Sequence, residues 1–127
     1  GAATAIKMVR SLFVKGLEAI TVETLLAAEA SGCFEEILSS VSASFPGLDW
    51  PRFAEYQFDR TTTHGRRRAA EMRESAATLA ALGLHGALAD AIADVQERMG
   101  EAGAGHLARD DLRASVRSVL SARLGRP

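Results

Sequence analysis

The first thirty residues restrict the possible folds most strongly, because alanine, leucine, isoleucine, valine and methionine fill most of their positions. We predict a single helix over residues 3–30, which Ser31-Gly32 ends because glycine readily takes the left-handed cap conformation. Apolar residues lie on almost every side, a pattern typical of a buried helix. At about 1.5 Å per residue the helix is roughly 40 Å long, whereas a compact chain of this size has a radius of gyration of about 14 Å. We therefore expect its surplus apolar surface to pack against a second domain or a second copy of the chain.

Four polar residues interrupt this apolar helix at regular intervals. Lys7, Ser11, Lys15 and Glu18 are spaced i, i+4, i+8 and i+11, so they form one narrow stripe. Desolvation lowers the pKa of a buried lysine, and such a group is suited to proton transfer near neutral pH. Lys7 is therefore a candidate catalytic residue. On spacing alone, a lysine that extends from the helix start into solvent is the favoured interpretation.

The composition is that of one globular domain, with 127 residues, 47% hydrophobic and 24% charged residues, and a net charge of −1. This balance argues against nucleic-acid binding through a basic field. No apolar run is long enough for a membrane span, and residues 1–30 lack the short apolar core and cleavage site of a signal peptide, so we expect neither. Cys33 is a single cysteine and fits a small core residue in a reducing, cytoplasmic protein. The chain begins directly at a helix without an initiator methionine, so we expect it to be cut from a longer protein.

The rest of the sequence predicts an all-α fold of about six helices packed around the first. Asp49 is placed to cap a helix that has Pro51 in its first turn. The β-branched run Thr61-Thr62-Thr63 predicts a break or kink between Phe58 and Gly65. The further helices are expected over residues 33–45, 65–82, 86–99 and 108–123, and Gly83 is expected to end the helix over 65–82.

Three consecutive arginines, Arg66 to Arg68, stand at the start of the predicted helix 65–82. Such a stretch is usually a solvated face, but positive charge at a helix start opposes the helix dipole. This favours contact with a phosphate or carboxylate, which arginine binds through two hydrogen bonds. The three histidines are scattered and no ligand set has metal-binding spacing, so we expect no metal site.

The segment GAATAIKMVRS at residues 1–11 resembles the motif that opens the C-terminal helical domain of the β-hydroxyacid dehydrogenases. This superfamily includes 3-hydroxyisobutyrate dehydrogenase and 6-phosphogluconate dehydrogenase. In the motif an essential lysine follows small, glycine-rich residues, and an asparagine comes one turn later. Lys7 matches the lysine, and Ser11 stands where asparagine is usual.

A second segment, HGRRRAAEM at residues 64–72, is similar to another landmark of the superfamily, a Lys-Asp pair that opens a helix beneath the active site. Here Ala70 stands in place of the lysine and Glu71 in place of the aspartate, while Arg66 and Arg67 lie one turn earlier. Together with the strings KMVRS and KGLEA, this segment resembles a less-characterised branch of 6-phosphogluconate-dehydrogenase-like proteins. The resemblance extends to about residue 98.

The resemblance implies that residues 1–127 form the C-terminal, all-α substrate and dimerisation domain of an NAD(P)-dependent oxidoreductase. It implies that an N-terminal Rossmann domain, absent from this chain, binds NAD or NADP, and that the long helix forms a homodimer. The reaction would be at the CH–OH group of a small hydroxy acid, with or without a phosphate. Lys7 would be the general acid/base. The residues expected to contact the substrate are Ser11, Arg10, His64, Arg66 and Arg67.

Two alternatives stay open on the sequence. The first is an imine-reductase-like enzyme on the same scaffold with a C=N substrate. The second is a helical dimerisation module without chemistry, in which Lys7 is exposed to solvent. Titration of Lys7 would separate the enzyme from the module.

Overall fold

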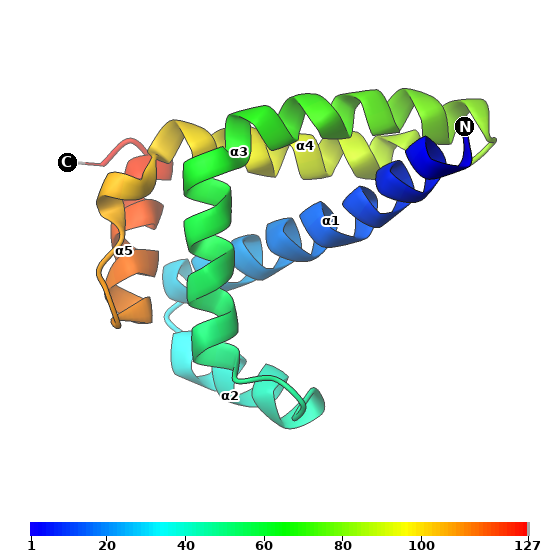
Figure 1. Ribbon diagram of the computed structural model, residues 1–127. Helices are drawn as coiled ribbons and strands as arrows, with labels where there is room; N and C mark the ends of the chain where they lie inside the picture. The colour runs from blue at the N-terminus through cyan, green and yellow to red at the C-terminus, as the bar shows by residue number, and fades with distance from the viewer. Residues whose placement is uncertain (127) are drawn as a thin grey trace.

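The computed structural model describes residues 1–126, and helices account for most of them (Figure 1). The predicted all-α class is confirmed, and no strand occurs in the described range. The elements in chain order are α1 (Ala2–Ala30), α2 (Phe34–Ser44), α3 (Trp50–Ala81), α4 (Gly86–Ala102), the short 3₁₀-helix η1 (Ala104–His106) and α5 (Leu112–Arg123). Across these residues, no helix is both long and apolar enough to cross a membrane.

Three of the predicted helix boundaries depend on residues that take the expected roles. Gly32 follows α1 with φ +73°, and Gly83 follows α3 with φ +80°, the left-handed conformation that glycine tolerates best. Asp49 caps α3, since its carboxylate accepts a hydrogen bond from the Arg52 amide at 3.4 Å. These boundaries are therefore confirmed.

Helix α3 corrects the predicted number of helices, because the two helices expected on either side of the threonine run are one 32-residue helix. The described chain thus has five α-helices. Figure 1 shows that α3 changes direction sharply near its middle, so the predicted kink is confirmed. Thr61 Oγ1 donates to the Gln57 carbonyl at 2.8 Å, and Thr62 Oγ1 donates to the Phe58 carbonyl at 2.7 Å. Such hydroxyl bonds to the preceding turn bend a helix without ending it.

The bend in α3 divides the core into two regions. The N-terminal arm of α3 packs with the second half of α1, with α2 and with α5 around the largest cluster, which contains Val22, Leu25, Leu26, Phe34, Ala54, Phe58, Met99, Leu112, Val116 and Val119. The C-terminal arm lies beside α4 and packs on α1 through smaller clusters, which contain Ala19, Ala69, Met72, Ile92 and Ala93, and Ala76, Leu79 and Ala89. One bent helix therefore connects both regions.

At the bend, α3 and α4 approach each other backbone to backbone. A Cβ atom on Gly65 would lie 2.7 Å from the Gly100 amide nitrogen and closer still to the Gln96 carbonyl oxygen. A Cβ atom on Gly100 would lie 2.7 Å from the Arg66 amide nitrogen. Only glycine fits at these two positions, and this contact fixes where the second arm of α3 crosses α4.

Within this chain, the first helix is buried over its second half and exposed over its first half. Val22, in the second half of α1, is fully buried, whereas Ile6 and Phe13 are 69% and 71% exposed. The physical reason is that the first half extends along the C-terminal arm of α3 and along α4, which cover only part of its circumference (Figure 1). An apolar stripe on α1 is thus left facing solvent.

Candidate functional site

A polar groove lies between the first half of α1 and the C-terminal arm of α3. Its cavity volume is about 340 Å³. The groove is lined by Thr4, Lys7, Met8, Ser11, Glu71, Glu74, Ser75 and Thr78. The structure therefore brings together Lys7, Ser11 and Glu71, which lie in the two segments of the sequence that resemble dehydrogenase motifs.

Lys7 lies near the N-terminal end of α1 at the mouth of the groove and is exposed to solvent. The desolvation expected for an apolar helix is therefore absent in this chain, because the helix itself is uncovered there. Ser11 lies one turn further along and is half-buried. Lys15 Nζ donates to Ser11 Oγ at 3.5 Å. The two lysines of the polar stripe thus lie on either side of the Ser11 hydroxyl along α1.

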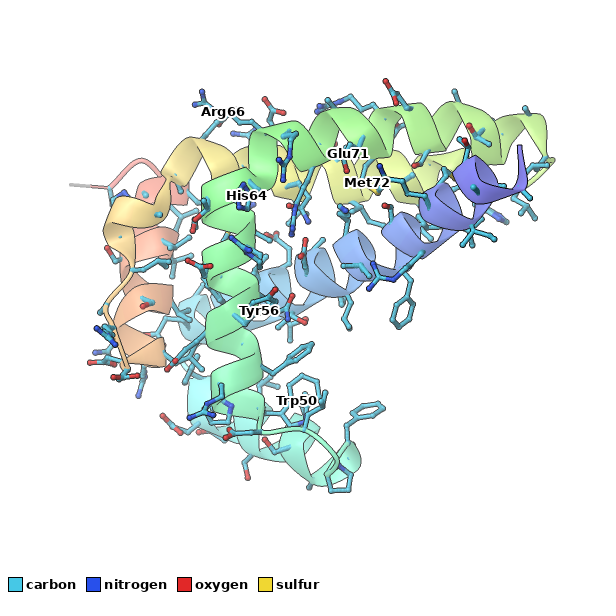
Figure 2. The ribbon with its side chains drawn as sticks, in the orientation of Figure 1. Trp50, Tyr56, His64, Arg66, Glu71 and Met72 are labelled. Atoms are coloured by element: carbon cyan, nitrogen blue, oxygen red, sulfur yellow. The ribbon has the colours of Figure 1, made fainter. Side chains whose placement is uncertain are left out.

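Glu71 connects the two helices that form the groove. Its carboxylate lies 3.5 Å from Lys15 Nζ on α1 and 4.0 Å from Arg67 Nε on α3. Figure 2 shows Glu71 on the C-terminal arm of α3. The carboxylate therefore balances one cation from each helix, and a second anion in this part of the groove would be repelled.

Beyond Lys15, the polar stripe continues into a buried network. Glu18 is 2% exposed and forms an ion pair with Arg68 of α3. Gln96 of α4 donates to Glu18 Oε1 at 2.9 Å and to the Lys15 carbonyl at 3.2 Å. These contacts hold α1, α3 and α4 in register and fix the position of the stripe. Gln96 did not appear among the expected site residues, although a glutamine on the apolar face between Ile92 and Met99 was a usable signal.

His64 lies at the bend of α3 and is half-buried (Figure 2). Its Nε2 atom lies 2.8 Å from an Nη2 of Arg60. Burial lowers the pKa of His64 below 6.5, and the charges of Arg60, Arg67 and Arg68 lower it further, while Asp59 acts in the opposite direction. The structure therefore surrounds His64 with positive charge.

Of the five expected substrate contacts only Ser11 lines the groove, and Arg10, His64, Arg66 and Arg67 do not. Arg66 is exposed, and its side chain packs towards Gly100 of α4. Arg10 is exposed on α1 and does not line the cavity. His64 and Arg67 lie on the side of α3 that carries Glu71. In the part of the chain that the structure describes, no group of three potential metal ligands is found.

Comparisons with known proteins give two findings. Residues 28–99 match the family model described as a domain of unknown function (DUF1932). A crystal structure of a conserved hypothetical protein from Sinorhizobium meliloti 1021 is similar over 96% of this chain, with 37% sequence identity and a TM-score of 0.85. The chain covers 42% of that protein's length. No curated protein matches the sequence.

Proposed function

The chain belongs to the DUF1932 family, a C-terminal domain of NAD(P)-binding 3-hydroxyisobutyrate dehydrogenase-like proteins, and from this premise we propose that it is the substrate domain of an NAD(P)-dependent oxidoreductase. Its reaction would be at the CH–OH group of a small hydroxy acid. The observation that supports this most directly is the polar groove, where Lys7 and Ser11 of α1 face Glu71 of α3. All three match positions of the dehydrogenase motifs.

In the proposed reaction, Lys7 acts as the general acid/base. Its uncharged amine accepts the proton of the substrate hydroxyl during oxidation and returns that proton during reduction. Lys7 is exposed in this chain, and a second domain that covered the mouth of the groove would remove water from it and favour the uncharged amine. The Ser11 hydroxyl, one turn away, both donates and accepts hydrogen bonds and would orient the substrate oxygen.

The nicotinamide would be bound mainly by an N-terminal Rossmann domain outside this chain. When bound, it would supply the chemistry of hydride transfer. No strand occurs among the described residues, so they offer no strand-to-helix glycine turn of the kind that holds a dinucleotide phosphate. These residues would instead supply the substrate-binding part of the active site. Lys7 lies at an open edge of the groove, where another domain has access to it.

The anionic end of the substrate would lie towards Arg67 and His64 on α3. Arginine forms paired hydrogen bonds with a carboxylate or a phosphate. We place the anion there rather than at Arg66 or Arg10, because Arg67 Nε lies 4.0 Å from the carboxylate of Glu71 in the groove and the Arg67 charge acts on His64. Glu71 separates this region from the mouth of the groove and would exclude a second anion near Lys7.

The exposed apolar stripe of α1 would form a homodimer interface. Ile6, Val9, Phe13 and Ile20 are 57% to 71% exposed, and they repeat at i, i+3, i+7 and i+14 along one face. A hollow of about 640 Å³ lies beside the stripe, between α1 and α4, with Leu88 at its edge. Contiguous exposed apolar surface of this kind is typical of a protein–protein interface.

The test of the catalytic role is Lys7→Ala in the longer protein that contains this domain. Turnover should fall by about 10² to 10⁴, the usual contribution of general acid–base catalysis, while NAD(P) binding persists. Lys15→Ala removes the other lysine of the same stripe and should reduce turnover far less, since Lys15 is paired with Glu71. Near-normal turnover of Lys7→Ala would contradict the role.

The exposure of Lys7 is also what a dimerisation module without chemistry would show. Such a module would leave turnover unaffected by Lys7→Ala, yet would still depend on the apolar stripe of α1. Measuring both properties in the same variants separates the two functions.

A further inference from the structure

Four cationic or potentially cationic side chains gather on one face of α3 at its bend. They are spaced i, i+4, i+7 and i+8, so they form one stripe across roughly two turns of the helix. We call Arg60, His64, Arg67 and Arg68 the arginine–histidine cluster. Figure 2 shows its histidine where the two arms of α3 meet. The cluster follows the groove along α3, beyond Glu71.

Two donors of the cluster make no hydrogen bond within residues 1–126, although one of them, Arg60 Nε, lies 3.5 Å from Asp59 Oδ2. The Nε atoms of Arg60 and Arg68 are both buried and make no hydrogen bond. These arginines stand one turn before and one turn after His64. Buried donors are normally paired, and a guanidinium presents its donors in a geometry that matches a carboxylate or a phosphate. The two Nε–H groups are therefore suited to binding an acceptor with oxygen atoms.

The hydrogen bond with Arg60 defines the protonation state of His64. A guanidinium can only donate, so His64 Nε2, which lies 2.8 Å from Arg60 Nη2, must be the acceptor and must be unprotonated. The tautomer with the proton on Nδ1 follows from this. The charged groups around His64 are Asp59, Arg60, Arg67 and Arg68 on α3, and Glu18 on α1, which is paired with Arg68. Helix α4 contributes the uncharged Gln96 to this network.

We infer that the arginine–histidine cluster binds an oxyanion, the carboxylate or phosphate group of the substrate, and that His64 takes up one proton from water when the oxyanion binds. An oxyanion would offset the arginine charges that now disfavour an imidazolium. Once protonated, Nε2 can no longer accept from Arg60, so the 2.8 Å bond breaks and both groups donate to the oxyanion. The identification of the oxyanion as part of the substrate rests on the proposed function.

The experiment is calorimetric titration of the chain with sulfate and, separately, with acetate, in two buffers of different ionisation enthalpy near pH 7. Neither anion titrates near this pH, so the difference in heat between the buffers counts protons taken up by the protein. We expect uptake approaching one proton per anion. Sulfate affinity should strengthen as the pH falls from 8 to 6, by up to about tenfold per pH unit. A preference for sulfate indicates a phosphate substrate, and a preference for acetate a carboxylate substrate.

Three variants assign the effect to the cluster. His64→Gln should abolish proton uptake, and Arg60→Gln should weaken sulfate binding by about tenfold or more. Arg73→Gln is the matched control, because it also removes one positive charge from α3. Arg73 lies on another face of α3, where it pairs with Glu97 of α4. In the unmodified chain, the titration midpoint of the His64 imidazole, followed by NMR, should rise when sulfate is added.

The inference is overturned if neither anion binds, if binding occurs without proton uptake, or if uptake persists in His64→Gln. Its failure differs from failure of the proposed function. Lys7→Ala should leave anion binding and proton uptake unchanged, because Lys7 lines the groove, whereas no member of the arginine–histidine cluster does. If Lys7→Ala stays active while proton uptake is observed, only the catalytic role fails.

Discussion

Glu18 of α1 and Arg68 of α3 form an ion pair in which the two side chains are only 3% and 13% exposed. Removing one partner leaves the other charge buried and uncompensated. We predict that Glu18→Ala lowers the free energy of unfolding by about 3–5 kcal/mol, measured by urea denaturation. The double variant Glu18→Leu with Arg68→Leu should recover most of this loss, since two apolar residues leave no buried charge.

The control for this pair is the exposed ion pair of Arg73 with Glu97, at 3.3 Å. Glu97→Ala should change stability by less than about 1 kcal/mol. If Glu18→Ala and Glu97→Ala lower the free energy of unfolding equally, the prediction that the buried ion pair matters more to stability is wrong.

The close approach of α3 and α4 predicts a steric penalty at Gly65. Gly65→Ala places a Cβ against the backbone of α4, which cannot move as a flexible side chain would. The free energy of unfolding should fall by roughly 1–3 kcal/mol or more. Gly47→Ala, where the added Cβ meets nothing within 4 Å, should stay within about 0.5 kcal/mol of the original protein. Thermal unfolding of the two variants side by side checks this.

The ionisation of Glu29 should make the free energy of unfolding depend on pH. Its carboxylate accepts hydrogen bonds from Arg113 Nε at 3.0 Å and Arg117 Nε at 2.8 Å. Burial raises the pKa of Glu29, but the two arginines more than offset this and hold it below 4.5. A carboxylate with a lowered folded pKa stabilises the fold above its unfolded pKa, and this stabilisation is lost as the pH falls through the folded value.

We therefore predict that Glu29→Gln is less stable than the original protein by roughly 1 kcal/mol at pH 7. The difference should shrink as the pH falls below about 4, as measured by urea denaturation at pH 7, 5 and 3. Glu35→Gln, at an exposed carboxylate 3.9 Å from Arg113, should have little effect at any of these values. A difference for Glu29→Gln that is constant with pH would contradict the assignment.

The proposed dimer depends on the apolar stripe of α1. Phe13→Ser should weaken self-association by about tenfold or more, because exposed aromatic residues dominate such interfaces. The stability of the monomer should change little, since Phe13 is 71% exposed in the chain. Sedimentation velocity over a range of concentrations measures the association. Leu124→Ser, which replaces an exposed leucine at the other end of the molecule, should leave it unchanged.

Most of the fold followed from local signals in the sequence. Gly32, Gly83 and Asp49 end or begin helices because their backbone or side-chain chemistry acts within one turn. The continuity of α3 did not follow, because a threonine run that weakens a helix can also bend it when its hydroxyls bond to the preceding turn. Whether these bonds form depends on the burial of Thr61 and Thr62, which the rest of the fold determines.

The sequence predicted how the site residues are arranged along α1, but not which residues of other helices they contact. The spacing of Lys7, Ser11, Lys15 and Glu18 correctly placed them on one stripe, but it could not tell which helix would face them. The pairing of Lys15 with Glu71 joins residues far apart in sequence, and no local pattern encodes it. For the same reason, the sequence could not show that Arg66 turns away from the groove. The catalytic and binding roles stay predictions until the variants are measured.

Helices α3 and α4 are joined by residues 82–85, so their contact closes a short loop, whereas α1 meets α3 and α4 over long separations. Glu18 and Arg68 are 50 residues apart, and Gln96 bonds to a Lys15 carbonyl 81 residues away. Short loops close with little loss of entropy. During synthesis, α1 is made before any of the helices it packs on. The face of α1 that packs on α3 and α4 therefore stays open to solvent until the α3–α4 hairpin exists, and chaperones that bind apolar segments would have access to it.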